Sequence, residues 1–268
     1  MPELPEVETI RRQLDKVLVG QRVINLQGLS LKVEGKKILG VKRKAKMIII
    51  ELASRNQRLA SSFLLIHLKM TGQLIYSNQR LASSVQNKYT RAIFILDKGK
   101  LFFNDLRKFG WIKLVTRDQL LELCKKLPPD VIDKEFDEKY LQKVLASSGR
   151  AVKLVLLDQQ KMGGIGNIYA NEALFCAAID PRTTASRLKS VEVNRLYKAI
   201  RKVINQGIKY GGSTASDEHF VNALGKPGKF QEHFQVYENK KICKKCGTKI
   251  IKIKLGGRGT YYCPQCQK

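Results

Sequence analysis

Two Cys-x2-Cys pairs near the C-terminus, separated by 16 residues, constrain the fold of this chain more than any other feature of its sequence. The four thiols belong to Cys243, Cys246, Cys263 and Cys266. Their spacing is close to that of zinc ribbons, in which four thiolates bind one metal ion. Two disulfides are the alternative, but a reducing compartment disfavours them. The pattern therefore predicts one zinc ion held by a C-terminal β-hairpin.

The charge balance of the chain indicates a polyanionic partner. Lysine and arginine number 50 against 23 aspartate and glutamate residues, which gives a formal net charge of +27. Nucleic acid suits such an excess, because binding releases condensed counterions. A membrane surface is the alternative, yet no apolar run approaches the ~20 residues of a membrane span. Glu3, Glu6 and Glu8 are not typical of a secretory signal. We therefore predict a cytoplasmic protein that binds nucleic acid and no membrane.

The first half of the chain has the pattern of one helix followed by strands. Apolar residues at positions 7, 10, 14, 17 and 18 share one helical face, with Pro5 suited to the first turn and Gly20 to the end. Short apolar segments then predict strands over residues 23–26, 47–52, 63–68, 92–96, 101–103 and 111–115. Lys98-Gly99 is predicted as a hairpin turn. This pattern is typical of a β-sandwich or a barrel.

The second half is predicted to be helical. The run of residues 127–130, Leu-Pro-Pro-Asp, interrupts the strand pattern and predicts an interdomain linker. Helices are expected over residues 137–145, with Asp137 as the cap, and over 151–159, 165–178 and 190–208. Cys124 and Cys176 lie singly in helical apolar segments and are predicted to be buried thiols. The heptapeptide at residues 56–62 recurs identically at 78–84, and both copies are predicted to form surface loops.

Pro2 is the candidate nucleophile. If Met1 is removed, the Pro2 nitrogen becomes a free secondary amine, and a free α-amine has a pKa of about 7.7–8.0. Such an amine can attack an electrophilic sugar carbon and form an iminium. The alternative is that Pro2 and Pro5 only shape the entry of a helix, and the first six residues alone favour this alternative.

Three separate motifs match one protein family in the same order. They are Pro2-Glu3-Leu4-Pro5-Glu6, then Gly163-Gly164-Ile165-Gly166-Asn167-Ile168-Tyr169, and finally the four-cysteine hairpin. With these motifs the chain resembles the bacterial formamidopyrimidine-DNA glycosylases from its first residue to its last. Leu4 favours this branch, because the sister endonuclease VIII group typically has glycine at that place.

The resemblance implies an α+β fold of two domains, with the zinc hairpin as a third segment. Residues 1–126 would form an N-terminal β-sandwich with flanking helices. Residues 127–232 would contain the linker, a helix-two-turn-helix DNA-binding domain and a loop that closes over the damaged base. Residues 233–268 would form the zinc-finger β-hairpin.

The resemblance also implies a bifunctional enzyme of base excision repair. It would excise oxidised purines such as 8-oxoguanine and formamidopyrimidines, and then cut the strand by β- and δ-elimination. Pro2 would attack C1′ of the flipped nucleotide, and Glu3 would be the acid/base carboxylate. Glu6 would bind the sugar or orient the helix N-terminus. A plain favourable interaction of Glu6 with the helix dipole is the alternative.

Two loops resemble those that fill the space left by a flipped base. Met70 would wedge into the base stack, Arg107 would pair with the orphaned cytosine, and Phe109 would open the neighbouring step. The alternative is that Met70 and Phe109 are core residues at strand ends. Their glycine-rich and charged flanks favour loop tips.

Phosphate contacts are expected from Lys46 and Arg258, which the resemblance places among the catalytic residues, and from Asn167 at a helix start. Lys153 and Tyr237 are weaker candidates for the same role. The chain departs from the family pattern at residues 85–92, where histidines are missing and Lys88 and Arg91 are the only substitute cations. A basic residue is common where this chain has Ser216.

The expected partner is therefore damaged double-stranded DNA, bound by a monomer in the bacterial cytoplasm. Two other functions stay open at this point. One is an endonuclease VIII-like glycosylase for oxidised pyrimidines, and the other is a non-catalytic DNA-binding protein that contains zinc.

Overall fold

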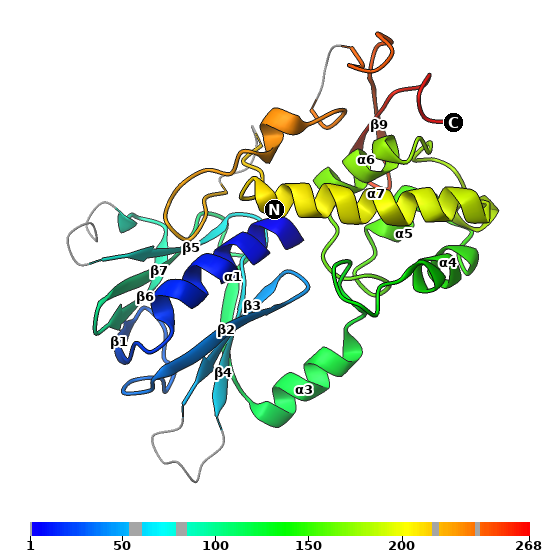
Figure 1. Cartoon of the computed structure of the whole chain (residues 1–268). Coiled ribbons are helices and arrows are strands. Elements are labelled where there is room, and N and C mark those ends of the chain that lie inside the picture. Colours follow the sequence, from blue (N-terminus) through cyan, green and yellow to red (C-terminus); the bar gives the residue numbers. More distant parts are fainter. Residues whose placement is uncertain (1, 54–60, 79–84, 216–219, 239–241) are drawn as a thin grey trace. The chain divides into compact units, whose positions relative to one another are not determined.

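The structure, a computed structural model, describes residues 2–53, 61–78, 85–215, 220–238 and 242–268 (Figure 1). The chain divides into two compact units. Unit 1 contains residues 1–126 and 208–231, and unit 2 contains residues 127–207 and 232–268. Ser216 and most of the repeated heptapeptide lie outside the described residues.

Unit 1 contains two four-stranded antiparallel sheets. The first sheet has the order β1 (Val23–Gln27), β6 (Thr90–Leu96), β7 (Gly99–Asp105) and β5 (Gly72–Ser77). The second has the order β2 (Ile38–Lys44), β3 (Met47–Leu52), β4 (Ser62–His67) and β8 (Trp111–Thr116). Every predicted strand is present, whereas β2 and β5 were not predicted.

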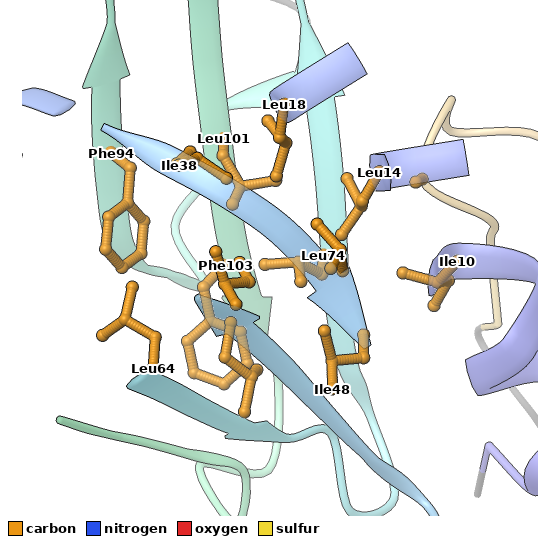
Figure 2. Packing of buried hydrophobic residues seen from close by; sticks show 14 of the residues in the cluster. Ile10, Leu14, Leu18, Ile38, Ile48, Leu64, Leu74, Phe94, Leu101 and Phe103 are labelled. Atoms are coloured by element: carbon orange, nitrogen blue, oxygen red, sulfur yellow. The ribbon is translucent and has the colours of Figure 1, made fainter. Parts of the chain in front are cut away.

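One apolar core joins both sheets to helix α1 (Leu4–Leu18). Side chains on the inner faces alternate along the strands, so that Ile48 of β3, Leu64 of β4 and Phe103 of β7 meet in the same cluster (Figure 2). On the predicted apolar face of α1, Ile10 and Leu14 are fully buried against this cluster and Val17 is partly buried. Burial of such a side chain contributes about 1.5–3 kcal/mol. The core therefore fixes α1, and with it the N-terminal motif, on the sandwich.

A second, smaller cluster explains why β3 is apolar on both faces. Met47, Ile49, Phe63 and Leu65 lie on the opposite side of the second sheet from the main core. Leucines of helix α3 (Arg117–Lys126) pack against them. The prediction that Cys124 of α3 is buried is wrong, because α3 contacts the sheet along one face only and has no fully buried residue.

The turn between β6 and β7 lies one residue earlier than predicted. Leu96 pairs with Gly99, so that Asp97 and Lys98 form the turn and Gly99 begins β7. A Cβ atom on Gly99 would lie 2.6 Å from the hydroxyl oxygen of Tyr76. Glycine is therefore required here for the close approach of β5.

Residues 208–231 belong to unit 1, although the sequence analysis grouped them with the helical domain. The reason is a set of hydrogen bonds to α1 and β5. The backbone N–H of Ala223 donates to Oε1 of Gln13 at 2.9 Å, and the Ala223 carbonyl accepts from the N–H of Tyr76 at 2.8 Å. The described parts of this segment, residues 208–215 and 220–231, are thus a strap over the sandwich.

Unit 2 combines helices with a two-stranded hairpin. The helices are α4 (Glu138–Ala146), α5 (Val152–Leu156), α6 (Asn167–Cys176) and α7 (Ser190–Lys209), with short 3-10 helices at Ala185–Arg187 and Phe230–His233. The predicted cap is confirmed, since Oδ1 of Asp137 accepts from the N–H of Tyr140 at 2.7 Å. Strands β9 (Ile251–Leu255) and β10 (Arg258–Tyr262) form the hairpin.

Two helices of unit 2 are shorter than predicted. Helix α5 ends at Leu156 and α6 ends at Cys176, and turn residues follow each of them. Cys176 is exposed at this end, so the prediction of a buried thiol is wrong there too. Among the helices of the described residues, none combines the length and the apolar character that crossing a membrane requires.

Candidate functional site

The N-terminal motif is held by a buried carboxylate. Glu6 is 1% exposed, and its Oε2 accepts a hydrogen bond from the backbone N–H of Glu3 at 2.8 Å. Its other oxygen, Oε1, accepts from the backbone N–H of Ser213 at 2.8 Å. Glu6 therefore orients the start of α1, one of the two roles predicted for it, and also ties residues 211–213 to that start. Pro2 and Glu3, which precede Glu6 in the chain, are buried as well.

Gly212 makes this contact possible. Its φ of +83° is in the left-handed region, and a Cβ atom there would lie 2.9 Å from Cγ of Glu6. The hydroxyl of the next residue, Ser213, is buried and finds no hydrogen-bond partner within the described residues. The predicted Gly211-Gly212 break is thus the place where the strap meets the N-terminus of α1.

The three residues predicted to fill the space of a flipped base lie together on the surface of unit 1. Met70 is 39% exposed and Phe109 is 54% exposed, so neither is a core residue. A terminal nitrogen of Arg107, Nη1, lies 3.2 Å from Sδ of Met70, and its guanidinium stacks 4.9 Å from the centre of the Phe109 ring. The structure therefore favours the loop-tip interpretation over the core interpretation.

Asp105, which the sequence analysis missed, organises these two loops. It is 1% exposed, and its Oδ1 accepts from the hydroxyl of Thr71 at 2.6 Å. Its Oδ2 accepts from the backbone N–H of Gly110 at 2.7 Å. The backbone N–H of Arg107 in turn donates to the Thr71 hydroxyl at 3.0 Å. One carboxylate thus connects the loop of Met70 with the loop of Arg107 and Phe109.

We expect Asp105→Asn to lower the free energy of unfolding by about 1–3 kcal/mol, because an amide nitrogen cannot accept the bond from the buried N–H of Gly110. Urea unfolding followed by circular dichroism measures this loss. Asp97→Asn is the control, since the Asp97 carboxylate accepts an exposed bond from the N–H of Arg22. Equal losses in the two variants would contradict a bracing role for Asp105.

Lys46 lies in the turn between β2 and β3. Lys44 pairs with Met47, which leaves Ala45 and Lys46 as the turn residues. Lys46 is 5% exposed, so it is not the ordinary solvated charge that its lysine-rich flanks would allow. Its charge lies close to His67 at the end of β4. Burial, then the charges of Lys69 and Lys46, lower the pKa of His67 to about 4.

His67 shapes the start of the Met70 loop. Its Nδ1 accepts from the backbone N–H of Lys69 at 3.0 Å, which requires a ring without a proton on that nitrogen. Lys69 has a φ of +53°, a conformation that few non-glycine residues adopt. The neutral imidazole therefore supports a strained turn directly ahead of Met70.

The low pKa of His67 makes a testable contribution to stability. The folded state disfavours the protonated ring, so the unfolded state binds this proton more readily. Stability should therefore fall as the pH drops from the ordinary value of 6.5 through the folded value of about 4. His67→Gln keeps an acceptor without a titrating group, and should lose less stability than the wild type over this interval. Identical pH profiles of the unfolding free energy would contradict this assignment.

Lys88 and Arg91 flank the start of β6. Lys88 is exposed, with Nζ 5.3 Å from the centre of the Tyr89 ring. Arg91 is half-buried, and its Nη1 finds no hydrogen-bond partner within the described residues. Lys88 thus keeps an exposed cationic group in this region, whereas the Nη1 atom of Arg91 is buried.

In unit 2 the four cysteines form a metal site. Their Sγ atoms all lie within 4.8 Å of one another, with Cys243 and Cys266 3.8 Å apart and Cys246 and Cys263 3.5 Å apart. Zn–S bonds of about 2.3 Å in a tetrahedron require S···S distances of about 3.8 Å. These separations fit one zinc ion, and they are too long for the disulfide alternative.

Two side chains from the helices hold the tip of the zinc hairpin. Nζ of Lys153 donates to the carbonyl of Gly259 at 2.9 Å and to the hydroxyl of Thr260 at 2.7 Å. Nδ2 of Asn167 donates to the same Gly259 carbonyl at 3.1 Å. Arg258, the neighbouring residue, is exposed. Lys153 is fully buried, and it supports strand β10, which begins with Arg258.

Polar residues in the middle of α6 also hold strand β10 of the hairpin and residues 235–237. Both oxygens of buried Glu172 accept backbone bonds, at 2.9 Å from Gln235, 2.9 Å from Val236 and 2.8 Å from Tyr237. Burial raises the pKa of the Glu172 carboxyl, although these bonds oppose the rise. Oδ1 of Asn171 accepts from the N–H of Tyr261 at 2.8 Å. The Tyr237 ring itself packs 5.3 Å from that of Tyr261.

The sequence analysis missed Asn171 and Glu172, although a signal was present. Both are polar residues inside a helix whose other described positions are mostly apolar and buried. A buried polar pair needs partners. The segment from residue 235 and the hairpin strand β10 provide them.

Comparisons with known proteins agree with this architecture. Three family models match: the Formamidopyrimidine-DNA glycosylase N-terminal domain over residues 1–112, the Formamidopyrimidine-DNA glycosylase H2TH domain over residues 127–219, and a zinc finger found in FPG and IleRS over residues 241–268. The Formamidopyrimidine-DNA glycosylase of Pelotomaculum thermopropionicum is 41% identical, over 100% of this chain and 99% of its own.

Solved structures are similar over the whole chain. The MutM (Fpg) protein of Thermus thermophilus has a TM-score of 0.87 at 34% identity, covering 99% of this chain and 98% of its own. Two Lactococcus lactis Fpg complexes, each at 34% identity with 100% of both chains covered, contain DNA. One is a variant with Fapy-dG DNA, with a TM-score of 0.89, and the other is the wild type with DNA containing an oxidised pyrimidine, with a TM-score of 0.88. The predicted fold class and zinc ion are confirmed.

Proposed function

We propose, since the chain belongs to the family of formamidopyrimidine-DNA glycosylases, that it excises oxidised purines from duplex DNA through a covalent intermediate on Pro2. The family places it among the DNA glycosylases of base excision repair that also have AP lyase activity. The observation that carries the proposal is the N-terminal motif itself. Pro2 and Glu3 stand directly before α1, with the Glu3 backbone held by the buried carboxylate of Glu6.

The proposed chemistry begins at the Pro2 nitrogen. Its lone pair forms a bond to C1′ of the damaged nucleotide while the bond from C1′ to the base breaks. The proton of the new ammonium passes to the departing base, and the restored lone pair then opens the sugar ring and gives an iminium. Glu3 protonates the ring oxygen and relays protons. Loss of a C2′ proton then expels the 3′ phosphate in β-elimination, and a further elimination expels the 5′ phosphate.

The remaining site residues are proposed to bind the flipped-out state of the DNA. Met70, Arg107 and Phe109 occupy the space of the extruded nucleotide, which offsets part of its unstacking cost of a few kcal/mol. Lys46, Asn167 and Arg258 contact phosphates, with Lys88 and Arg91 as further cations. Lys153 and Tyr237 support the hairpin that carries Arg258. We further propose that the enzyme acts as a monomer in the bacterial cytoplasm. Only the bacterial origin is supported by the relatives, which come from bacteria.

Borohydride trapping tests the proposed function. The protein is incubated with duplexes that contain 8-oxoguanine, formamidopyrimidine or thymine glycol, reduced, and analysed by intact mass. We expect a covalent adduct with the two purine lesions, formed faster than with thymine glycol. A protein that only binds DNA gives no adduct on any duplex, and this result would refute the enzymatic proposal.

An activity on oxidised pyrimidines is a second candidate, and one observation favours it. The wild-type Lactococcus lactis Fpg protein, 34% identical to this chain, has been solved with DNA containing an oxidised pyrimidine. The same trapping experiment decides between the two. A faster reaction with thymine glycol than with 8-oxoguanine would assign this chain to the endonuclease VIII-like specificity.

A further inference from the structure

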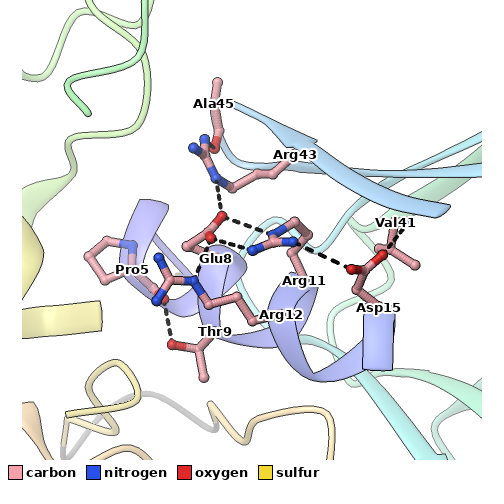
Figure 3. Close-up of polar contacts among 9 residues, drawn as sticks. All are labelled: Pro5, Glu8, Thr9, Arg11, Arg12, Asp15, Val41, Arg43 and Ala45. Atoms are coloured by element: carbon pink, nitrogen blue, oxygen red, sulfur yellow. Dashed lines mark hydrogen bonds and ion pairs between the residues drawn. The ribbon is translucent and has the colours of Figure 1, made fainter. Parts of the chain in front are cut away.

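A buried carboxylate on α1 gathers three guanidinium groups (Figure 3). Glu8 is 6% exposed, and its two oxygens accept from Arg11 at 2.8 and 3.2 Å, from Arg12 at 2.7 Å and from Arg43 at 3.1 Å. Arg11 and Arg12 belong to the same helix, whereas Arg43 lies near the end of β2. Glu8 therefore connects α1 with the second sheet.

The connection is made by ionised groups. Burial opposes ionisation of Glu8, but hydrogen bonds from Arg11 and Arg12 and the charges of Arg11 and Arg43 lower the pKa of its carboxyl below the ordinary value. The side chains of Glu8 and Arg43 are 8% and 5% exposed. An exposed ion pair is screened by water and contributes little, whereas a buried pair loses far more when one partner is removed.

Arg43 extends this connection to the turn that carries Lys46. While its Nε donates to Glu8, its Nη1 donates to the carbonyl of Ala45 at 2.9 Å. Ala45 has a φ of +51°, a strained conformation for a residue with a Cβ atom, which persists only where surrounding contacts impose it. The planar guanidinium of Arg43 is suited to this use, because it presents several N–H groups in a fixed geometry.

A second contact ties the same strand to the same helix. Oδ1 of Asp15, two turns beyond Glu8 on α1, accepts from the backbone N–H of Val41 at 2.9 Å. The strand β2 is therefore attached to α1 at both Val41 and Arg43. The position of the turn after β2 thus depends on the helix whose start carries the proposed nucleophile.

We propose that Glu8 and Arg43 are positioning residues that fix Lys46 through the carbonyl of Ala45. They would so keep Lys46 at a constant position relative to Pro2 and Glu3. This inference rests on the proposed function, since Lys46 is one of its phosphate-binding residues. One helix would then set both the nucleophile and the cation. Such preorganisation matters because a displacement of about 1 Å in a reacting group can cost roughly 100-fold in rate.

The first experiment measures the structural half of the inference without any activity. Hydrogen exchange is followed over residues 41–50 in the full-length zinc-bound protein. Arg43→Lys keeps the charge but cannot bond Glu8 and Ala45 in the same geometry, and we expect exchange of this segment to be at least about fivefold faster. Arg12→Lys is the matched control, because Arg12 also binds Glu8 but is 55% exposed and lies on α1. Unchanged exchange in Arg43→Lys overturns the inference.

The second experiment tests whether Arg43 acts through Lys46. Single-turnover cleavage of an abasic duplex is measured for Arg43→Lys, Lys46→Ala and the double variant. We expect Arg43→Lys to slow the wild-type protein by about 10-fold. In the Lys46→Ala protein the same substitution should slow cleavage by less than about 2-fold, because the side chain that Arg43 positions is already absent. Arg12→Lys should slow the wild type by less than about 2-fold.

The outcomes separate the inference from the proposed function. Additive losses in the double variant would mean that Arg43 has only a general structural role, and would overturn the inference. A wild-type protein that neither cleaves the abasic duplex nor forms an adduct would overturn the proposed function, and with it the link to Lys46. Hydrogen exchange would still decide whether Arg43 holds the turn.

Discussion

Replacement of Pro2 by glycine is expected to slow base excision by at least about 100-fold, which corresponds to about 2.7 kcal/mol of transition-state stabilisation. Glycine leaves a terminal amine after Met1 is removed, so a nucleophile remains. Its imine can lose a proton and become neutral, however, whereas the proline iminium has no N–H and keeps its charge. The proline ring also ties the nitrogen to the side chain, which restricts the direction of its lone pair.

The matched control for this variant is Pro5→Ala. Pro5 lies in the first turn of α1 and is not terminal, and its carbonyl accepts the Thr9 hydroxyl at 2.8 Å. If the prolines served only to shape the helix entry, the two variants would have similar effects on stability and little effect on rate. We expect Pro5→Ala to remain within a few-fold of the wild-type rate, because the nucleophile is intact.

The measurements are single-turnover excision and peptide mapping of the reduced adduct. The adduct should map to residue 2, and the intact mass of active protein should lack Met1. Fully active protein that retains Met1 would refute the assignment of Pro2 as nucleophile. An adduct on a lysine would refute it as well.

Local sequence patterns predicted most strands that contain a short apolar run. Strands β3 and β4 are apolar on both faces because two separate clusters cover them, and such runs are visible without any partner. Strand β2 escaped prediction for a physical reason. A shift in its pairing between Ile38 and Gly40 breaks the two-residue period, so its buried residues Ile38 and Val41 are three positions apart.

The residues of the candidate site also divide into those that a local motif predicts and those that depend on distant partners. Met70, Arg107 and Phe109 were predicted from short motifs, and the structure places them in one cluster. Asp105 accepts from Thr71, which is 34 residues away in the chain, and Glu172 accepts from Tyr237, 65 residues away. Glu6 accepts from Ser213, 207 residues away. No local pattern encodes such distant pairs. The sequence shows the charge of Lys153, which suits a phosphate, but it does not show that this side chain is fully buried against the hairpin.

Removal of zinc is expected to weaken binding to an abasic duplex by at least about 100-fold. A two-stranded hairpin such as β9 and β10 is at best marginally stable alone, and structural zinc contributes about 10–16 kcal/mol of binding free energy that is also folding free energy. Without the metal, Gly259 and Thr260 lose their fixed positions on Lys153, and the exposed Arg258 loses the position from which we propose that it contacts phosphate.

Fluorescence anisotropy with a labelled abasic duplex measures this loss in chelated wild type and in Cys263→Ser. Cys176→Ser is the control, because Cys176 is an exposed thiol outside the metal site. Arg258→Ala should weaken binding less than zinc removal does, since it deletes one contact and leaves the hairpin folded. Added zinc should restore affinity to the chelated wild type but not to Cys263→Ser. Chelated protein that binds as tightly as the zinc-bound form would exclude the hairpin from the DNA interface.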